Sequence, residues 1–200
     1  MKILLVGASG VLGSAVSTAL SERGHDVVEA SRQGEYRVDL RHARSITALY
    51  DAVGQVDAVA CTAGKTPFAA FGDLALEDYS SGLEDKLLGQ IELVRQGIDH
   101  VTPGGGFTLV SGVLAAQPIA TGTVASTVNG GVEAFVTAGA AVLPHGLRLN
   151  AVSPTALEES WGGYAEFFPG FLPVPAATAA LAYVRAIEGV GTGQIHSVGH

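Results

Sequence analysis

The sequence is poor in the residue types that mark several large classes of protein. It has one cysteine, Cys61, in 200 residues, which excludes a disulfide framework and a cysteine-ligated zinc site. Only three of its 11 basic residues are lysines, and 19 acidic residues bring the net charge to −8. An acidic chain without a basic cluster is not typical of proteins that bind nucleic-acid phosphates. We therefore expect no disulfide and no nucleic-acid partner.

Long apolar runs are missing as well. The mean hydropathy is +0.35 and 48% of the residues are hydrophobic, yet polar residues, glycine or proline interrupt every stretch. No stretch reaches the ~18 apolar residues of a membrane-spanning helix, and the short apolar start of the chain resembles a strand more than a signal peptide. We expect no membrane partner and a cytoplasmic location. The six histidines are scattered without ligand spacing, so we predict no metal site.

Glycine is what the sequence has in excess, with 27 residues in 200, against about 7% in an average protein. Apolar runs of strand length alternate with segments of helical periodicity. The predicted strands are 2–6, 26–30, 36–40, 56–61, 107–110, 148–152 and 194–198. The predicted helices are 11–23, 45–53 with Ser45 as N-cap, 79–100, 123–143 and 176–188, and a turn is expected at 104–106. This alternation predicts one α/β domain over residues 1–200, a doubly wound parallel sheet of about seven strands with helices on both faces.

A glycine-rich turn connects the first predicted strand to the first predicted helix. Its glycines follow Gly-x-x-Gly-x-x-Gly spacing, which lets a backbone turn tightly and approach a pyrophosphate at a helix N-terminus. A P-loop is excluded because no Gly-Lys-Ser/Thr follows, and the Gly-x-Ser-x-Gly motif of a hydrolase nucleophile is absent. The turn therefore predicts dinucleotide binding by Gly7, Ser9, Gly10, Val11, Leu12 and Gly13.

Further motifs resemble the short-chain dehydrogenase/reductase family along nearly the whole chain. Asp39 and Leu40 follow the third strand, where the family contacts adenine, and Thr62-Ala63-Gly64 resembles its Asn-Ala-Gly signature. Ser153-Pro154 closes a near-complete match to its sixth-strand motif. The resemblance implies a Rossmann-type fold, an oxidoreductase with a small carbonyl or alcohol substrate, and a homodimer or homotetramer through the two long helices. It also implies cofactor contacts at Asp39, Leu40, Thr62, Ala63, Gly64 and Pro154.

The end of the second strand bears on the choice of cofactor. An acidic residue there favours NAD, whereas an arginine favours the 2′-phosphate of NADP. Ser31 occupies the usual acidic position and Arg32 follows it, so the sequence favours NADP over NAD. Glu29 could still select NAD, and Arg32 could be a solvated loop residue.

The resemblance also shows that the usual catalytic residues are altered. Family members use an asparagine, a serine, a tyrosine and a lysine. Here Lys86 stands at the asparagine position and Asn129 at the lysine position. Ala125 replaces the tyrosine, and Gly112, next to Ser111, falls at the serine.

Two functions therefore stay open. The chain is either an oxidoreductase with a rearranged site of Lys86, Ser111 and Asn129, or a dinucleotide-binding sensor or regulatory protein that transfers no hydride. A buried lysine can have a lowered pKa that suits proton transfer, but Lys86 could instead reach solvent beside Asp85 and Glu84. The irregular, aromatic segment 153–175 is interpreted as a substrate lid, with a subunit contact or a cover of the core as alternatives.

Overall fold

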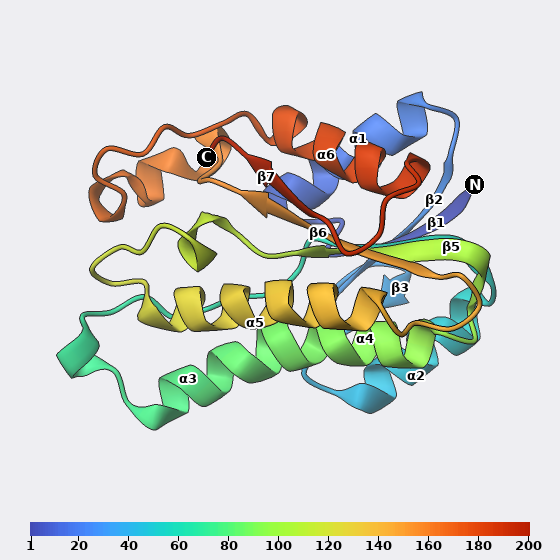
Figure 1. The fold of residues 1–200 in the computed structure, drawn as a ribbon, viewed down its shortest axis with the longest axis horizontal. Coiled ribbons are helices and arrows are strands. Elements are labelled where there is room, and N and C mark those ends of the chain that lie inside the picture. Colours follow the sequence, from blue (N-terminus) through green and yellow to red (C-terminus); the bar gives the residue numbers. More distant parts are fainter.

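Parallel strands and covering helices alternate along the computed structural model, which describes residues 1–200 (Figure 1). All seven strands belong to one parallel sheet with the order β3-β2-β1-β4-β5-β6-β7. The strands are β1 Lys2–Val6, β2 Asp26–Ser31, β3 Tyr36–Arg37, β4 Val56–Cys61, β5 Val101–Val110, β6 Arg148–Pro154 and β7 Ile195–Val198. The predicted fold class, a Rossmann-type doubly wound sheet, is confirmed. Its strand order reverses between β1 and β4, where such sheets bind ligands at the carboxyl ends of the strands.

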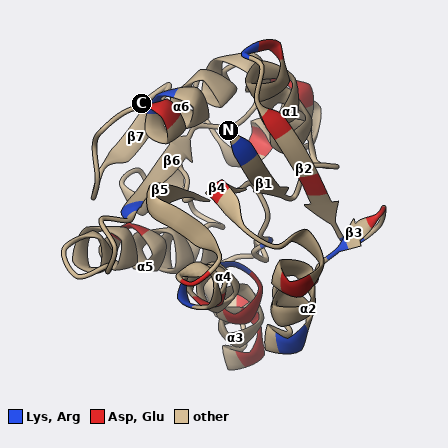
Figure 2. Ribbon diagram, turned by 90° about the vertical axis from the view of Figure 1, so that its right-hand side faces the viewer, with Lys and Arg blue, Asp and Glu red and all other residues tan.

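Helices cover the sheet on both faces (Figures 1 and 2). They are α1 Val11–Glu22, α2 Ala43–Val53, α3 Leu76–Gly82, α4 Gly89–Gly97, α5 Thr123–Ala140 and α6 Ala176–Glu188. On one face, α1 and α6 bury a cluster that includes Val16, Leu20 and Tyr183. On the other face, α2, α4 and α5 bury a larger cluster, in which Leu93 and Val132 are fully covered. No helix has the length and apolar character needed to cross a membrane.

The second helix begins earlier than its sequence pattern predicts. The prediction that Ser45 is its N-cap is wrong, because α2 starts at Ala43 and His42 is the N-cap. The hydroxyl of Ser45 instead accepts a hydrogen bond from the backbone N–H of Asp39 at 3.0 Å. This bond holds the chain that leaves the short strand β3, which ends at Arg37, so Asp39 lies beyond the strand.

Two further regions, the start of β5 and the first long helix, also differ from the prediction. The expected turn at 104–106 is wrong, because β5 already starts at Val101 and runs through these glycines. A Cβ at Gly105 would lie 2.3 Å from the Asp57 carbonyl oxygen, so glycine permits the close approach of β4. The first long helix begins at Leu76 and contains a π-helical stretch, Leu83–Leu88, between α3 and α4.

Candidate functional site

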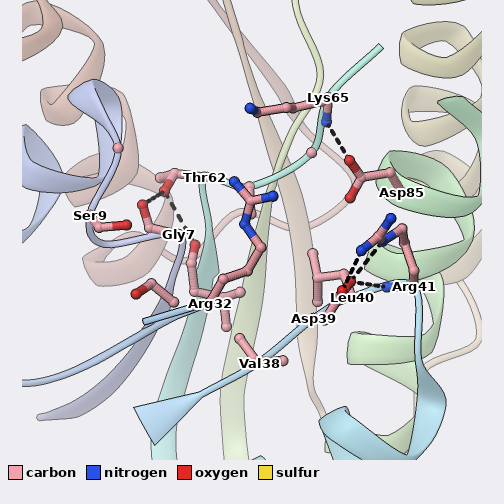
Figure 3. A pocket seen from close by; sticks show the side chains of 15 residues that line it. Gly7, Ser9, Arg32, Val38, Asp39, Leu40, Arg41, Thr62, Lys65 and Asp85 are labelled. Atoms are coloured by element: carbon pink, nitrogen blue, oxygen red, sulfur yellow. Dashed lines mark hydrogen bonds and ion pairs between the residues drawn. The ribbon is translucent and has the colours of Figure 1, made fainter. Parts of the chain in front are cut away.

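A cavity of about 210 Å³ opens at the carboxyl ends of β1, β2 and β4 (Figure 3). Strand β1 delivers the glycine turn, β2 delivers Ser31 and Arg32, and β4 delivers the segment after Cys61. The lining includes most of the residues predicted to bind the dinucleotide: Gly7, Ser9, Gly10, Ser31, Arg32, Asp39, Leu40, Thr62, Ala63 and Gly64. The structure therefore brings together residues that lie up to 57 positions apart in the chain.

The glycine turn packs too closely for larger residues. Gly7 has a φ of 91°, and a Cβ there would lie 2.8 Å from the backbone nitrogen of Ala63. A Cβ at Gly13 would lie 2.1 Å from the Gly7 carbonyl oxygen. Helix α1 follows with Gly10 as an N-cap that makes no side-chain hydrogen bond. The first N–H groups of α1 are thus available to an anion at the positive end of the helix dipole, which fits a pyrophosphate.

Charged side chains surround the outer end of this cavity. Arg41 binds both carboxylate oxygens of Asp39, at 3.0 and 2.6 Å, and these hydrogen bonds lower the pKa of Asp39 to about 2. Asp39 is therefore committed to Arg41. Arg32 makes no ion pair and points into the cavity (Figure 3). The arginine that the sequence associates with a 2′-phosphate is free to bind one.

A second cavity, of about 490 Å³, adjoins the first and shares Thr62, Gly64 and Lys65 with it. Its walls combine apolar and polar residues, and the only charged side chains among them are those of two lysines. Its remaining lining residues are Thr66, Phe68, Lys86, Gly112, Val113, Leu114, Ala125, Asn129, Pro154, Thr155, Ala156, Leu157, Ser160, Tyr164 and Phe168. No carboxylate lines this cavity, although the chain carries a net charge of −8.

Lys86 is the buried cation of the second cavity, with only 9% of the residue exposed. It lies in the π-helical stretch, and its ammonium donates to the Asn129 Oδ1 at 2.7 Å and to the Ser111 carbonyl oxygen at 2.9 Å. Both partners are neutral. Burial lowers the pKa of Lys86 to about 8, and the nearby Cys61 and Glu133 oppose that shift. Lys86 can therefore gain and lose a proton near neutral pH.

The structure places the other two catalytic candidates in different surroundings. Asn129 lines the second cavity and holds Lys86. The hydroxyl of Ser111 donates to Glu133 Oε1 at 2.8 Å, and Ser111 is not among the residues that line either cavity. Its carbonyl oxygen, rather than its hydroxyl, contributes to the site. Gly112 and Ala125, which the sequence resemblance aligns with the family's serine and tyrosine, also line this cavity.

The aromatic segment after β6 covers the second cavity. The segment contains two 3₁₀ helices, Glu158–Gly163 and Ala165–Phe167, and its aromatic residues lie in these helices and directly after them. Tyr164 and Phe168 line the cavity, while Trp161 packs against the small cluster that contains Phe168. The entrance to Lys86 is thus bordered by apolar side chains.

Some predicted residues lie outside the first cavity, and others were missed. Val11, Leu12 and Gly13 begin α1 behind the turn, and Pro154 lines the second cavity. The lining residues that the sequence analysis did not single out are Val6, Val38, Arg41, Lys65 and Asp85. Lys65 had a readable signal, because it directly follows Thr62-Ala63-Gly64 in a chain with only three lysines.

Comparisons with known proteins agree with this geometry. The model of a family described as enoyl-(acyl carrier protein) reductase matches residues 7–192. The crystal structure of protein lin1944 from Listeria innocua is 44% identical, covers 99% of both chains and superposes with a TM-score of 0.96. A small-chain dehydrogenase in complex with NADPH is 24% identical, covers 99% of this chain and 96% of its own, and has a TM-score of 0.88. No curated protein sequence matches.

Proposed function

Because the chain belongs to the short-chain dehydrogenase/reductase family, we propose that it is an NADP(H)-dependent oxidoreductase of a small carbonyl or alcohol substrate. The first cavity would hold the adenine and phosphate portion of the dinucleotide, and the adjoining second cavity would hold its nicotinamide and the substrate. The observation that carries this proposal is Lys86, a buried ammonium that borders the second cavity and has only neutral partners. Buried charges are costly unless a counter-charge compensates them. An oxygen that becomes negative during reduction supplies that counter-charge.

The choice of NADP rests on the end of β2. Arg32 lines the first cavity without an ion-pair partner, and Ser31 beside it has no negative charge to repel a phosphate. A guanidinium group matches phosphate geometry and charge. The complex of a similar dehydrogenase with NADPH supports the same choice.

The residues of this chain supply the proton and its placement. When bound, reduced nicotinamide supplies a hydride, that is, two electrons and a hydrogen. In the proposed reaction the substrate carbonyl oxygen would lie at Lys86 Nζ, which would donate a proton to that oxygen as it becomes negatively charged. Asn129 and the Ser111 carbonyl oxygen keep the ammonium in position. Neutral Lys86 then regains a proton from water, and an alcohol leaves.

Replacement of Lys86 by methionine tests this role. Lys86→Met keeps most of the length of the side chain but removes the ammonium group that donates the proton, so turnover should fall at least about 10²-fold, the usual scale for a positioned acid. NADPH binding, followed by calorimetry, should stay within about twofold. Lys2→Met is the matched control, because Lys2 lines neither cavity and binds the Val53 carbonyl oxygen. Unchanged turnover of Lys86→Met with a panel of aldehydes, ketones and quinones contradicts the role.

Replacement of Arg32 tests the cofactor. Arg32→Ala removes charge-assisted hydrogen bonds, so the affinity for NADPH should fall about 10- to 100-fold. The affinity for NADH, which lacks the 2′-phosphate, should barely change. Titration calorimetry with both dinucleotides decides the matter, and equal losses for the two would exclude the assignment to NADP.

A second function keeps the dinucleotide but drops the chemistry. Ala125 and Gly112 favour a non-catalytic NADP(H)-binding sensor, because they leave the cavity without the hydroxyl groups that the family uses. A wild-type protein that binds NADPH and reduces no member of the panel would make this the better proposal.

A further inference from the structure

Three cations line the first cavity, called the dinucleotide cavity below, and they differ in how their charges are neutralised. Arg41 is held by both oxygens of Asp39. Arg32 and Lys65 are exposed, and neither has a carboxylate within ion-pair distance. The other carboxylate of the cavity, Asp85, accepts a hydrogen bond from the backbone N–H of Lys65 at 3.3 Å and forms no ion pair with its ammonium. The cavity therefore contains two free positive charges.

The backbone of Lys65 is fixed by packing on both sides of the cavity. The segment after β4 touches the phosphate turn, since a Cβ at Gly7 would lie 2.8 Å from Thr62 Oγ1. It also touches the π-helical stretch, since a Cβ at Gly64 would lie 2.5 Å from Lys86 Cγ. With its backbone held in this way, Lys65 extends its side chain over the cavity. Figure 3 shows the Lys65 side chain directed toward the side of the cavity where Thr62 lies, and the Arg32 side chain rising from the end of β2 into the space between Thr62 and Lys65.

Two free cations that face one cavity repel each other unless an anion lies between them. The two carboxylates of the cavity are engaged elsewhere, since Asp39 binds Arg41 and Asp85 accepts from the backbone N–H of Lys65, and neither forms an ion pair with Arg32 or with the Lys65 ammonium. A phosphate group carries up to two negative charges and accepts several hydrogen bonds, which suits an ammonium and a guanidinium together. The glycine turn and the N-terminus of α1 already prepare the same cavity for phosphates.

We propose that Lys65 is a phosphate-binding residue that holds, together with Arg32, one phosphate group of the dinucleotide. The proposal rests on the proposed function, because it takes NADP(H) as the ligand. Arg32 reaches this phosphate from the end of β2, and Lys65 reaches it from the segment after β4. Since both side chains are exposed, the phosphate closes a contact between the two segments only when the dinucleotide is bound.

The test is titration calorimetry of the full-length protein with NADPH and with NADH. Lys65→Gln should weaken NADPH binding about 5- to 20-fold, and Lys65→Arg should restore most of it. Arg44→Gln is the control, because Arg44 is an exposed cation outside the cavity, and its affinities should stay within about twofold. The loss should be larger for NADPH than for NADH, because Arg32 is assigned to the 2′-phosphate. Equal losses would place Lys65 at the pyrophosphate and overturn the site shared with Arg32. Unchanged binding of both dinucleotides by Lys65→Gln overturns the proposal.

The double variant Arg32→Gln/Lys65→Gln tests whether the two residues share one phosphate. If they do, its loss of affinity should be smaller than the product of the two single losses, because neighbouring contacts are not additive. Losses that multiply overturn the shared site. If the wild-type protein binds neither dinucleotide, the proposed function is overturned as well. If the wild type binds NADPH and the Lys65 variant binds it equally well, only the role of Lys65 is overturned.

Discussion

Lys86 combines a structural cost with the chemical role that we propose for it. Its ammonium is buried among neutral acceptors, and burial lowers its pKa from 10.5 to about 8 in the folded protein. In the unfolded chain the ammonium is hydrated and keeps the ordinary value. Between these two values the unfolded chain binds more protons than the folded protein, so the contribution of Lys86 to the free energy of unfolding rises with pH.

The expected result is a pH-dependent difference between the wild type and Lys86→Met. As the pH rises from 7 to 10, the wild type should gain stability relative to the variant, because the cost of burying a charge disappears once Lys86 is neutral. Urea unfolding at each pH measures this difference. Carbonyl reduction by the wild type should change in the opposite direction and decline above about pH 8, where the proton donor is lost. A stability difference that does not vary with pH would mean that Lys86 keeps its ordinary pKa.

From the sequence, site residues could be predicted only where they belong to a recognisable motif, whereas the contacts between them could not. Lys86 and Asn129 could be singled out because they exchange residue types with the resembling family. Their hydrogen bond could not be predicted, since it depends on the π-helical stretch that directs Lys86 toward α5. The contact between Ser111 and Glu133 depends likewise on how β5 meets α5. Such contacts join residues far apart in the chain, and no local pattern specifies them.

At the scale of elements, the phosphate turn and α1 form one packed unit. Gly13 lies in the first turn of α1, and a Cβ there would come within 2.1 Å of the Gly7 carbonyl oxygen. Gly13→Ala must therefore push the helix away from the turn. We expect a loss of about 1–3 kcal/mol in the free energy of unfolding, as for other overpacked sites, and a severe loss of NADPH affinity.

The matched control is a glycine in an open position of another helix. A Cβ at Gly130 in α5 would meet nothing within 4 Å. Gly130→Ala should raise the free energy of unfolding by about 0.5–1 kcal/mol, because alanine favours the helix, and should leave NADPH binding unchanged. Urea unfolding and calorimetry of both variants provide the comparison. Equal stability of Gly13→Ala and Gly130→Ala would mean that the turn tolerates a side chain.

Most elements could be predicted because each has its own periodicity and a glycine at its end. Strand β4 and helix α6 have the predicted boundaries. The start of β5 could not be predicted, because a run of glycines signals a turn unless the neighbouring strand requires close approach. The π-helical stretch was missed for a different reason, since its residues follow ordinary helical spacing.

At the scale of the whole molecule, the strand order determines where chemistry can occur. The order reverses between β1 and β4, and the dinucleotide cavity opens there. Alternation of strands and helices predicted this sheet, because a parallel strand needs a crossover and such crossovers are right-handed. The sequence did not specify how the segment after β6 folds over the second cavity, because that segment has no periodicity of its own.

The remaining expectation at this scale is a second copy of the chain. We propose a homodimer or homotetramer through the long helices, as the family resemblance implies. Leu88 and Ala134 are exposed apolar residues on these two helices, and an apolar side chain gains from being covered. Leu88→Arg and Ala134→Arg would each place a charge in the interface and should shift the protein toward monomer in sedimentation velocity. Val190→Arg, at a 96% exposed position beyond α6, should leave the mass unchanged. A wild type that sediments as a monomer would exclude the assembly, whereas a wild-type oligomer insensitive to both changes would place its interface on another face.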